Sequence, residues 1–211
     1  MAICQSLLLR KNGEIDSSGD FVDKYGWAFS SKTKPEEIRP ILSAKGAAMI
    51  VKKDIFWELG GFDKEYFFSF EDVDLGWRAW IWGYKVILVP KSVVYHDGKQ
   101  TTTKLKSTVD FHSVKNSMIL QLVNFEGWIS VRNFVTFLFV NIKQKISGSS
   151  MKQISGTVYS MPSFKIAFKS LRWILRNNSY ICKKQKIVKK NRVRTTKDLM
   201  DLGLIGVKET I

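Results

Sequence analysis

The stretch from Gly60-Gly61-Phe62-Asp63 to Glu71-Asp72-Val73-Asp74-Leu75 decides the fold of this chain. The two glycines follow an apolar run at 53–59, which we predict to be a short helix that ends at them. The acids of the second motif crowd the first turn of another helix, with Ser69 as its candidate N-cap. That helix is expected to run to about Trp82. The motif therefore lies at a helix N-terminus.

Strand patterns flank this stretch on both sides. Residues 46–51 are a small-then-apolar run typical of a buried strand, and residues 84–89 alternate and end at Pro90. Residues 92–96 are a candidate for another short strand. Beyond residue 109 the pattern turns helical, over 111–125 and 128–145, and the Ser/Gly-rich residues 146–161 read as a linker. These patterns predict an α/β class for residues 1–125 with helices packed after it.

The ordered series resembles the family-2 glycosyltransferases, and in particular their rhamnosyltransferase-like branch. The match covers about residues 8–125. Each element alone is weak, but the series at this spacing is highly specific. The residues that carry it are Gly46-Ala47-Ala48, Gly60-Gly61-Phe62-Asp63, Tyr66-Phe67-Phe68, Glu71-Asp72-Val73-Asp74-Leu75, Trp77-Arg78, Gly83-Tyr84, Pro90, His96 and Asn116.

The resemblance implies a GT-A fold and an inverting transfer of a sugar from a nucleotide diphosphate to an acceptor hydroxyl. Such a reaction needs a general base beside the hydroxyl, and the family's base corresponds to Asp72. Glu71, Arg78 and Ala47 are then candidates for substrate binding. Without the resemblance, the acids would read as carboxylates that complement the helix dipole, with Asp74 paired to Arg78 at i, i+4. For Arg78 we favour that pairing.

The resemblance also implies a divalent metal, Mg²⁺ or Mn²⁺, that stabilises the departing diphosphate. His96 is a candidate third ligand, although a polar residue at a strand end is an equal reading. In the family, the main metal ligands form an Asp-x-Asp motif in the N-terminal half. No counterpart of that half precedes Met1 in this sequence. Asp72-Val73-Asp74 matches the Asp-x-Asp pattern, but it lies where the family has its catalytic-base motif. We therefore do not interpret it as the metal site.

We therefore expect an incomplete GT-A fold that lacks the N-terminal nucleotide-binding half. The chain would be a truncated gene product, or a second chain would supply the missing half, and the isolated chain would be inactive. The alternative is a non-catalytic remnant that binds a glycan or a partner protein. Donor, acceptor and linkage are not encoded in the motifs present.

Charge divides the chain in two. Residues 1–100 hold 14 basic and 14 acidic side chains, whereas residues 101–211 hold 20 basic and 5 acidic ones. No acid lies between Glu126 and Asp198, which predicts an anionic partner. The sequence has no signature of a nucleic-acid-binding motif, so a membrane surface is preferred to nucleic acid. Cys4 and Cys182 fit no metal or redox spacing.

The basic half suggests how such a contact is made. At 164–176, Lys165, Lys169, Arg172 and Arg176 share one helical face, and apolar residues share another. The domain prediction is accordingly 1–125 for the glycosyltransferase part, 126–180 for amphipathic basic helices and 181–211 for a basic tail, flexible at 183–194. The most apolar stretch, 128–142, contains Arg132, Asn133 and Asn141, so we expect no membrane span. The predicted location is cytoplasmic, peripheral at the inner face of the membrane.

Overall fold

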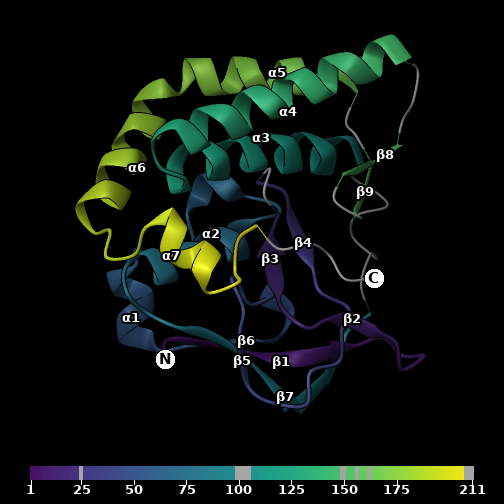
Figure 1. Cartoon of the computed structure of the whole chain (residues 1–211), viewed down its shortest axis with the longest axis vertical. Coiled ribbons are helices and arrows are strands. Elements are labelled where there is room, and N and C mark those ends of the chain that lie inside the picture. Colours follow the sequence, from purple (N-terminus) through teal and green to yellow (C-terminus); the bar gives the residue numbers. More distant parts are fainter. Residues whose placement is uncertain (24–25, 98–105, 148–150, 155–156, 161–162, 207–211) are drawn as a thin grey trace.

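A computed structural model describes residues 1–23, 26–97, 106–147, 151–154, 157–160 and 163–206 (Figure 1). Its centre is a mixed sheet in which β1 (Ile3–Leu9) pairs in parallel with β7 (Val86–Tyr95). On its other side, β1 pairs antiparallel with β2 (Ile15–Ser17) and β6 (Met49–Val51). A short strand, β5 (Arg39–Pro40), lies along the outer side of β7. The α/β class is thus confirmed.

β7 is longer than predicted. The register moves from Ser6↔Val89 to Leu7↔Val93, so the residues around Pro90 form a bulge within one continuous strand. Proline cannot donate to the ladder, and a bulge is where a strand tolerates it. The separate strands predicted at 84–89 and 92–96 are therefore one strand.

Smaller strands lie outside this sheet. β3 (Asp20–Val22) and β4 (Ala28–Ser30) form a two-stranded hairpin. β8 (Met151–Ile154) and β9 (Thr157–Ser160) pair in the region that we predicted to be a linker. The prediction of a strand at 46–51 is half right, because Gly46–Ala48 form a 3-10 turn and only the last three residues form β6.

Helices cover one side of the sheet. The element over Lys53–Glu58 is α1, and α2 spans Glu71–Ile81; a 3-10 turn at Lys64–Tyr66 lies between them. Figure 1 shows a helical layer beyond α2, made of α3 (Lys106–Asn124), α4 (Gly127–Ser147) and α5 (Phe164–Arg176). The predicted helices at 53–59, 111–125, 128–145 and 164–176 are confirmed. Within the described part of the chain, no helix is both long enough and apolar enough to cross a bilayer.

The prediction of a flexible tail at 183–194 is wrong. Those residues belong to α6 (Asn178–Lys190) and to the turn that leads into α7 (Thr196–Asp201). The helices bury Ile181, Val188 and Leu199 in the common core. Charge counting missed this because the apolar residues of α6 are few and widely spaced among lysines, whose apolar stems can lie along buried surface while their charged ends reach water.

The segment after α6 holds the end of α2. Arg194 donates hydrogen bonds to the carbonyl oxygens of Trp80 (3.0 Å) and Tyr84 (2.8 Å), and its guanidinium lies over the Trp80 ring. The backbone amides of Val193 and Arg194 both donate to Ile81. The last carbonyls of a helix have no partner within it. Residues 193–194 therefore cap α2 from a distance in sequence.

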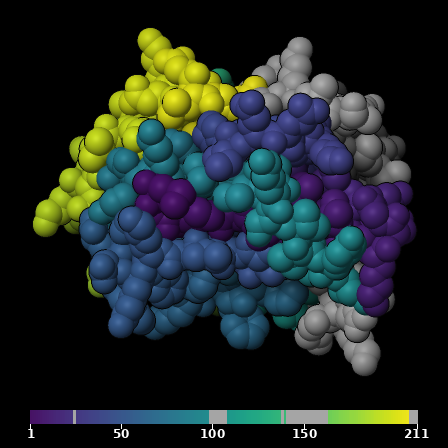
Figure 2. Space-filling model, turned by 90° about the horizontal axis from the view of Figure 1, so that it is seen from below, coloured from purple at the N-terminus to yellow at the C-terminus, as the bar shows by residue number. Residues whose placement is uncertain are grey.

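Figure 2 shows the molecule from below, where the N-terminal residues and β7 reach the surface. Large apolar side chains are exposed in this part of the structure, among them Ile50 of β6 and Tyr95 of β7. The sheet is thus covered by helices on one side and partly open on the other.

Candidate functional site

The N-terminus of α2 is preceded by a strained turn. Ser69 and Phe70 both have left-handed backbone conformations, with φ of 65° and 69°. Residues other than glycine rarely adopt this conformation. Phe70, and not Ser69, occupies the N-cap position, and no side chain caps the helix. The predicted Ser69 cap is wrong because its left-handed backbone turns the side chain toward Ser113, with 3.3 Å between the two hydroxyl oxygens.

Asn116 holds this turn in place. From the buried side of α3, its amide nitrogen donates to the carbonyl oxygens of Phe68 (2.8 Å) and Ser69 (2.7 Å). Two good hydrogen bonds from one amide compensate part of the backbone strain. Asn116 is therefore a positioning residue for the turn that delivers Glu71 and Asp72.

Asp72 is half-buried and fixed by backbone amides. Its Oδ2 accepts from the Gly46 amide at 3.1 Å, and its Oδ1 accepts from the Val73 amide at 2.8 Å. Burial raises the pKa of the Asp72 carboxyl, and the neighbouring Glu71 raises it further. Lys45 and the two amides lower it, but the net shift is upward. Among the described residues, no Lys or Arg forms an ion pair with Asp72 within 4 Å.

Lys45 connects Asp72 to a second carboxylate, Asp20, which no sequence motif singles out. Its ammonium nitrogen lies 3.3 Å from Oδ2 of Asp20, which is buried and accepts a 2.7 Å hydrogen bond from Ser30. Asp20 raises the pKa of Lys45 most strongly, against the effect of burial, and Asp72 adds to the increase. Burial, together with Asp72, raises the pKa of Asp20. Lys45 is thus a cation that acts on the pKa of both carboxylates.

Glu71 and Ala47 are each next in sequence to a residue of this site, Glu71 to Asp72 and Ala47 to Gly46. Oε2 of Glu71 is shielded from solvent and has no hydrogen-bond partner among the described residues. A buried carboxylate oxygen without a donor is costly in a closed protein, and it is the kind of atom that a substrate hydroxyl satisfies. Ala47 is exposed in the 3-10 turn next to Gly46. Both remain candidates for substrate binding.

Arg78 is occupied by the protein. Its Nη2 and Nε both contact Oδ2 of the buried Asp74, at 2.7 and 2.8 Å, as the i, i+4 reading predicted. Nη1 donates to the carbonyl oxygen of Leu59, and Nη2 also donates to that of Gly61. Because these contacts use all three guanidinium nitrogens, Arg78 fastens the double-glycine turn to α2. The structure favours this role over substrate binding.

His96 belongs to a separate polar cluster at the end of β7. Its Nδ1 lies 2.8 Å from Oδ2 of Asp16, which also contacts Arg10 and Lys32. Burial tends to raise the pKa of Asp16, but the hydrogen bond with His96 and the charge of Lys32 outweigh it, so the net shift is downward. A carboxylate on one ring nitrogen is the usual support for a histidine that ligates a metal through the other.

The chemistry of this donor set fits a metal only in part. Across the residues that the structure describes, no three His, Cys, Asp or Glu side chains gather in a way that could hold a metal ion. His96 supplies one nitrogen ligand with its support, and the other ligands would have to come from elsewhere. The sequence reasoning named His96 but missed Asp16, which lies 80 residues away in sequence.

The double-glycine motif is tied to the C-terminal helices. Lys184 of α6 pairs with Asp63 at 2.5 Å and with the buried Asp74 at 3.4 Å. Tyr180 donates a 2.8 Å hydrogen bond to Asp63. Asp63, Tyr180 and Lys184 border a cavity of about 560 Å³ between the Gly60-Gly61 turn and α6. The basic half of the chain is therefore part of the same packed unit as the motifs.

Comparison with known proteins agrees with the motif series. The chain is 29% identical over 113 residues to an N-acetylglucosaminyl-diphospho-decaprenol L-rhamnosyltransferase of Mycobacterium tuberculosis strain CDC 1551 / Oshkosh, and equally to that of strain ATCC 25618 / H37Rv. This chain resembles a rhamnosyltransferase. The aligned part makes up 52% of the chain but only 36% of each relative, so it spans about a third of their length. No family model matches the chain.

Proposed function

We propose that this chain carries the acceptor side of a glycosyltransferase that moves a sugar from a nucleotide-diphospho-sugar to an acceptor hydroxyl in cell-surface glycan synthesis, with inversion at the sugar carbon. One observation carries the proposal. In a chain that resembles a rhamnosyltransferase, a half-buried aspartate with a raised pKa sits at a helix N-terminus, next to a glutamate oxygen without a partner.

Asp72 would be the general base. It would accept the proton of the acceptor hydroxyl while that oxygen attacks the sugar carbon and the nucleoside diphosphate departs. A raised pKa makes the carboxylate a stronger base at neutral pH than an ordinary aspartate. Lys45 opposes that shift, which keeps the carboxylate ionised and ready to accept a proton. Glu71 would orient the acceptor through its unpartnered oxygen.

The leaving diphosphate needs positive charge, and a divalent metal, Mg²⁺ or Mn²⁺, would supply it. Of the described residues, His96 is the one we propose as a ligand, supported by Asp16. Residues outside this chain would then provide the remaining ligands and the nucleotide site, as part of a longer protein or as a second chain. The exposed Ile50 on β6, beside Gly46 and Ala47, is a suitable place for further strands to join.

The acceptor that we propose is lipid-linked, and the protein would work peripherally at the cytoplasmic face of the membrane. The two relatives are named for an N-acetylglucosaminyl-diphospho-decaprenol acceptor. The basic excess of residues 101–211 supports the same location, because an anionic leaflet attracts juxtamembrane basic residues.

The test is a transfer assay with the chain supplemented by its nucleotide-binding half. Asp72→Asn keeps the size of the side chain and removes the base, so turnover should fall by a factor of about 10²–10⁴. Asp54→Asn, an exposed acid in the first turn of α1, is the matched control and should leave turnover unchanged. Full activity of folded Asp72→Asn would exclude the base assignment. Glycan binding without any transfer would favour the non-catalytic alternative.

A further inference from the structure

Two neighbouring helices of the outer layer expose apolar stripes. On α4 the exposed side chains are Trp128 (75% exposed), Val131, Val135 and Phe139 (63%). Their steps of three and four residues place them on one helical face. Single exposed apolar residues are ordinary. Four of them on one helical face indicate a surface that binds another molecule or a membrane.

The second stripe lies on α5. Phe164, Phe168 (58% exposed) and Leu175 (69%) share one face, whereas Ala167, Ser170 and Ile174 are buried on another. The buried face packs mainly on α3, and α5 also contacts α4. The structure therefore corrects the single apolar face predicted for 164–176: part of it belongs to the core and part faces outward. We call the seven exposed residues of α4 and α5 the outer face.

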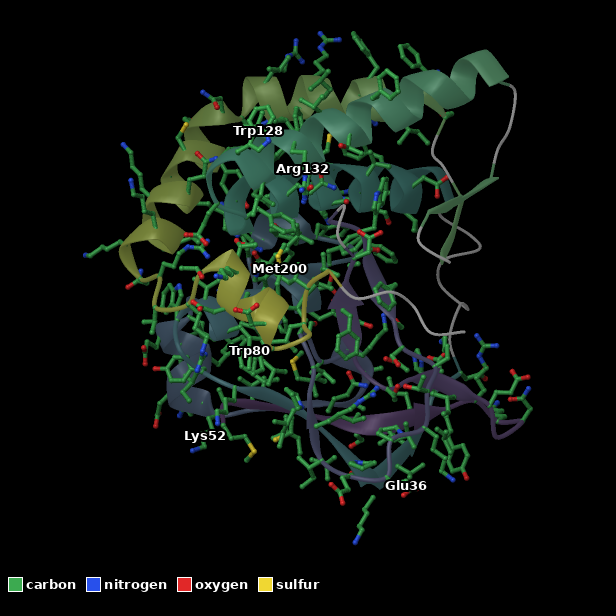
Figure 3. All side chains as sticks on the ribbon, in the orientation of Figure 1. Glu36, Lys52, Trp80, Trp128, Arg132 and Met200 are labelled. Carbon is green, nitrogen blue, oxygen red and sulfur yellow. The ribbon has the colours of Figure 1, made fainter. Side chains whose placement is uncertain are left out.

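Basic side chains flank the α5 part of the outer face. Lys165, Arg172 and Arg176 of α5 are exposed, and the structure shows no carboxylate within ion-pair distance of them in the part it describes. No acid occurs in the sequence between Glu126 and Asp198, so neither helix contains a negative charge. Figure 3 shows Trp128 and Arg132 in this layer, with nitrogen-tipped chains and rings projecting from its outer side.

We propose that the outer face of α4 and α5 is the surface by which this protein docks on an anionic lipid bilayer. The inference deepens the peripheral location proposed above and rests on it, but it does not depend on catalysis. Apolar side chains would enter the headgroup boundary, Trp128 would lie at the interface that tryptophan favours, and the basic residues would meet lipid phosphates. A protein partner would need an acidic apolar groove, whereas a leaflet offers both properties at once.

The placement also connects the surface to the site. α3 lies directly beneath α5, and its Asn116 holds the turn that precedes Glu71 and Asp72. One helix therefore separates the outer face from the candidate base. An acceptor that remains anchored in the leaflet would reach the site from the side of this helical layer.

The experiment is flotation of the purified chain with vesicles of phosphatidylcholine, with or without phosphatidylglycerol. The variant Trp128→Gln/Phe168→Gln/Leu175→Gln should lower binding to the anionic vesicles at least about tenfold, because it removes apolar insertion and leaves the charge unchanged. The variant Lys165→Gln/Arg172→Gln/Arg176→Gln should remove the salt sensitivity. The matched control is Ile50→Gln/Trp57→Gln, which changes equally exposed residues elsewhere and should bind like the parent.

Point substitutions are needed because deletion of 160–194 would remove the buried Ile181 and Val188 from the core. A second measurement uses quenching by brominated lipids. Trp128→Phe should still bind but should lose part of the quenched fluorescence, which places that residue in the boundary.

Equal flotation of the parent and the outer-face variant would overturn the proposal, as would equal binding to neutral and anionic vesicles. If the parent does not bind vesicles but forms dimers that the variant abolishes, the face belongs to a second copy of the chain. Sugar transfer to a water-soluble acceptor should survive the outer-face substitutions. If Asp72→Asn loses sugar transfer but floats like the parent, the catalytic proposal and the membrane-docking proposal are tested separately.

Discussion

The backbone amide of Gly46 donates a 3.1 Å hydrogen bond to Oδ2 of Asp72, and this bond joins two motifs that lie 26 residues apart in sequence. It lets a main-chain group, which no substitution at position 46 other than proline removes, help to set the pKa of the candidate base. The bond also stabilises the ionised carboxylate, since an amide donor favours the charged form.

Gly46→Pro should therefore raise the pKa of Asp72 above its already raised value. Lys45 has φ −63° and ψ 131°, a conformation that a following proline accepts, so the turn should survive. In a transfer assay the base works when ionised, so activity is lost as the pH falls through its pKa. The acid limb of the pH–rate profile should shift to higher pH.

Gly46→Ala is the control for that substitution. It keeps the amide, and a Cβ at this position would meet no atom within 4 Å. An acid limb at the same pH in Gly46→Pro and Gly46→Ala would show that the bond does not tune Asp72.

Lys45→Met should shift the same limb in the same direction and by more. Lys45 lowers the pKa of both Asp20 and Asp72, and its removal leaves Asp20 buried without its cation. We also expect a loss of roughly 3–5 kcal/mol in the free energy of unfolding unless Asp20 becomes protonated. Urea denaturation at neutral and mildly acidic pH measures this loss, which should shrink at the lower pH.

Lys52→Met provides the comparison, because Lys52 is exposed (Figure 3). Its stability and pH–rate profile should match those of the parent. If Lys45→Met behaves like Lys52→Met, Lys45 neither sets the pKa of Asp72 nor stabilises the buried Asp20.

Asn116→Ala should destabilise the chain by roughly 1–3 kcal/mol, because the half-buried carbonyl oxygens of Phe68 and Ser69 lose their donor. The left-handed turn at Ser69 and Phe70 would lose its support, so hydrogen exchange at residues 68–72 should accelerate more than in the rest of α2. Asn116→Asp, which places carboxylate oxygens against carbonyl oxygens, should be the worse of the two. If Asn116→Asp were as stable as the parent, the hydrogen bonds would not hold the turn.

Lys184→Met should cost roughly 2–4 kcal/mol, since it leaves Asp63 without a cation in a poorly solvated place and leaves Asp74 with Arg78 alone. Lys183→Met, at the exposed neighbouring position, should cost little. Thermal unfolding compares the two. Equal melting temperatures would mean that α6 is held by its apolar contacts alone.

The same pair predicts a loss of stability in acid. Burial tends to raise the pKa of Asp63, but Lys184, the Glu65 amide and Tyr180 outweigh it, so the folded pKa lies below the usual value. A depressed pKa stabilises the fold above the unfolded value of about 3.9, and that stabilisation disappears as the pH falls through the folded pKa. Asp63→Asn should therefore flatten the stability profile below about pH 4, when chemical denaturation is followed at successive pH values.

Sequence patterns predicted the elements that are set by local rules. α5 begins and ends where its periodicity indicates, and α1 ends just before the double glycine. The contacts that build the site are long-range and carry no local signal. Lys45 looks like any surface lysine, and Asp20 like a loop acid, until the fold brings them together.

Two predictions, the strand end at Pro90 and the tail at 183–194, failed because long-range contacts outweighed the local sequence signal. Pro90 indicated a strand end, but the parallel register with β1 carries β7 past it through a bulge. The basic run of α6 indicated a solvated tail, yet Ile181 and Val188 suffice to bury one side of the helix while Lys184 finds two carboxylates. A charge count cannot distinguish a lysine in solvent from one that neutralises a buried acid.

The cap that Arg194 and Val193 place on the end of α2 has a consequence for biosynthesis. On the ribosome, α2 emerges long before the residues that complete its last turn. Contacts between such distant segments form late, because the intervening chain must first be ordered. Until residues 192–194 have been made, the nascent chain carries Glu71 and Asp72 on a helix with an open end, and Trp80 without the guanidinium that later covers it.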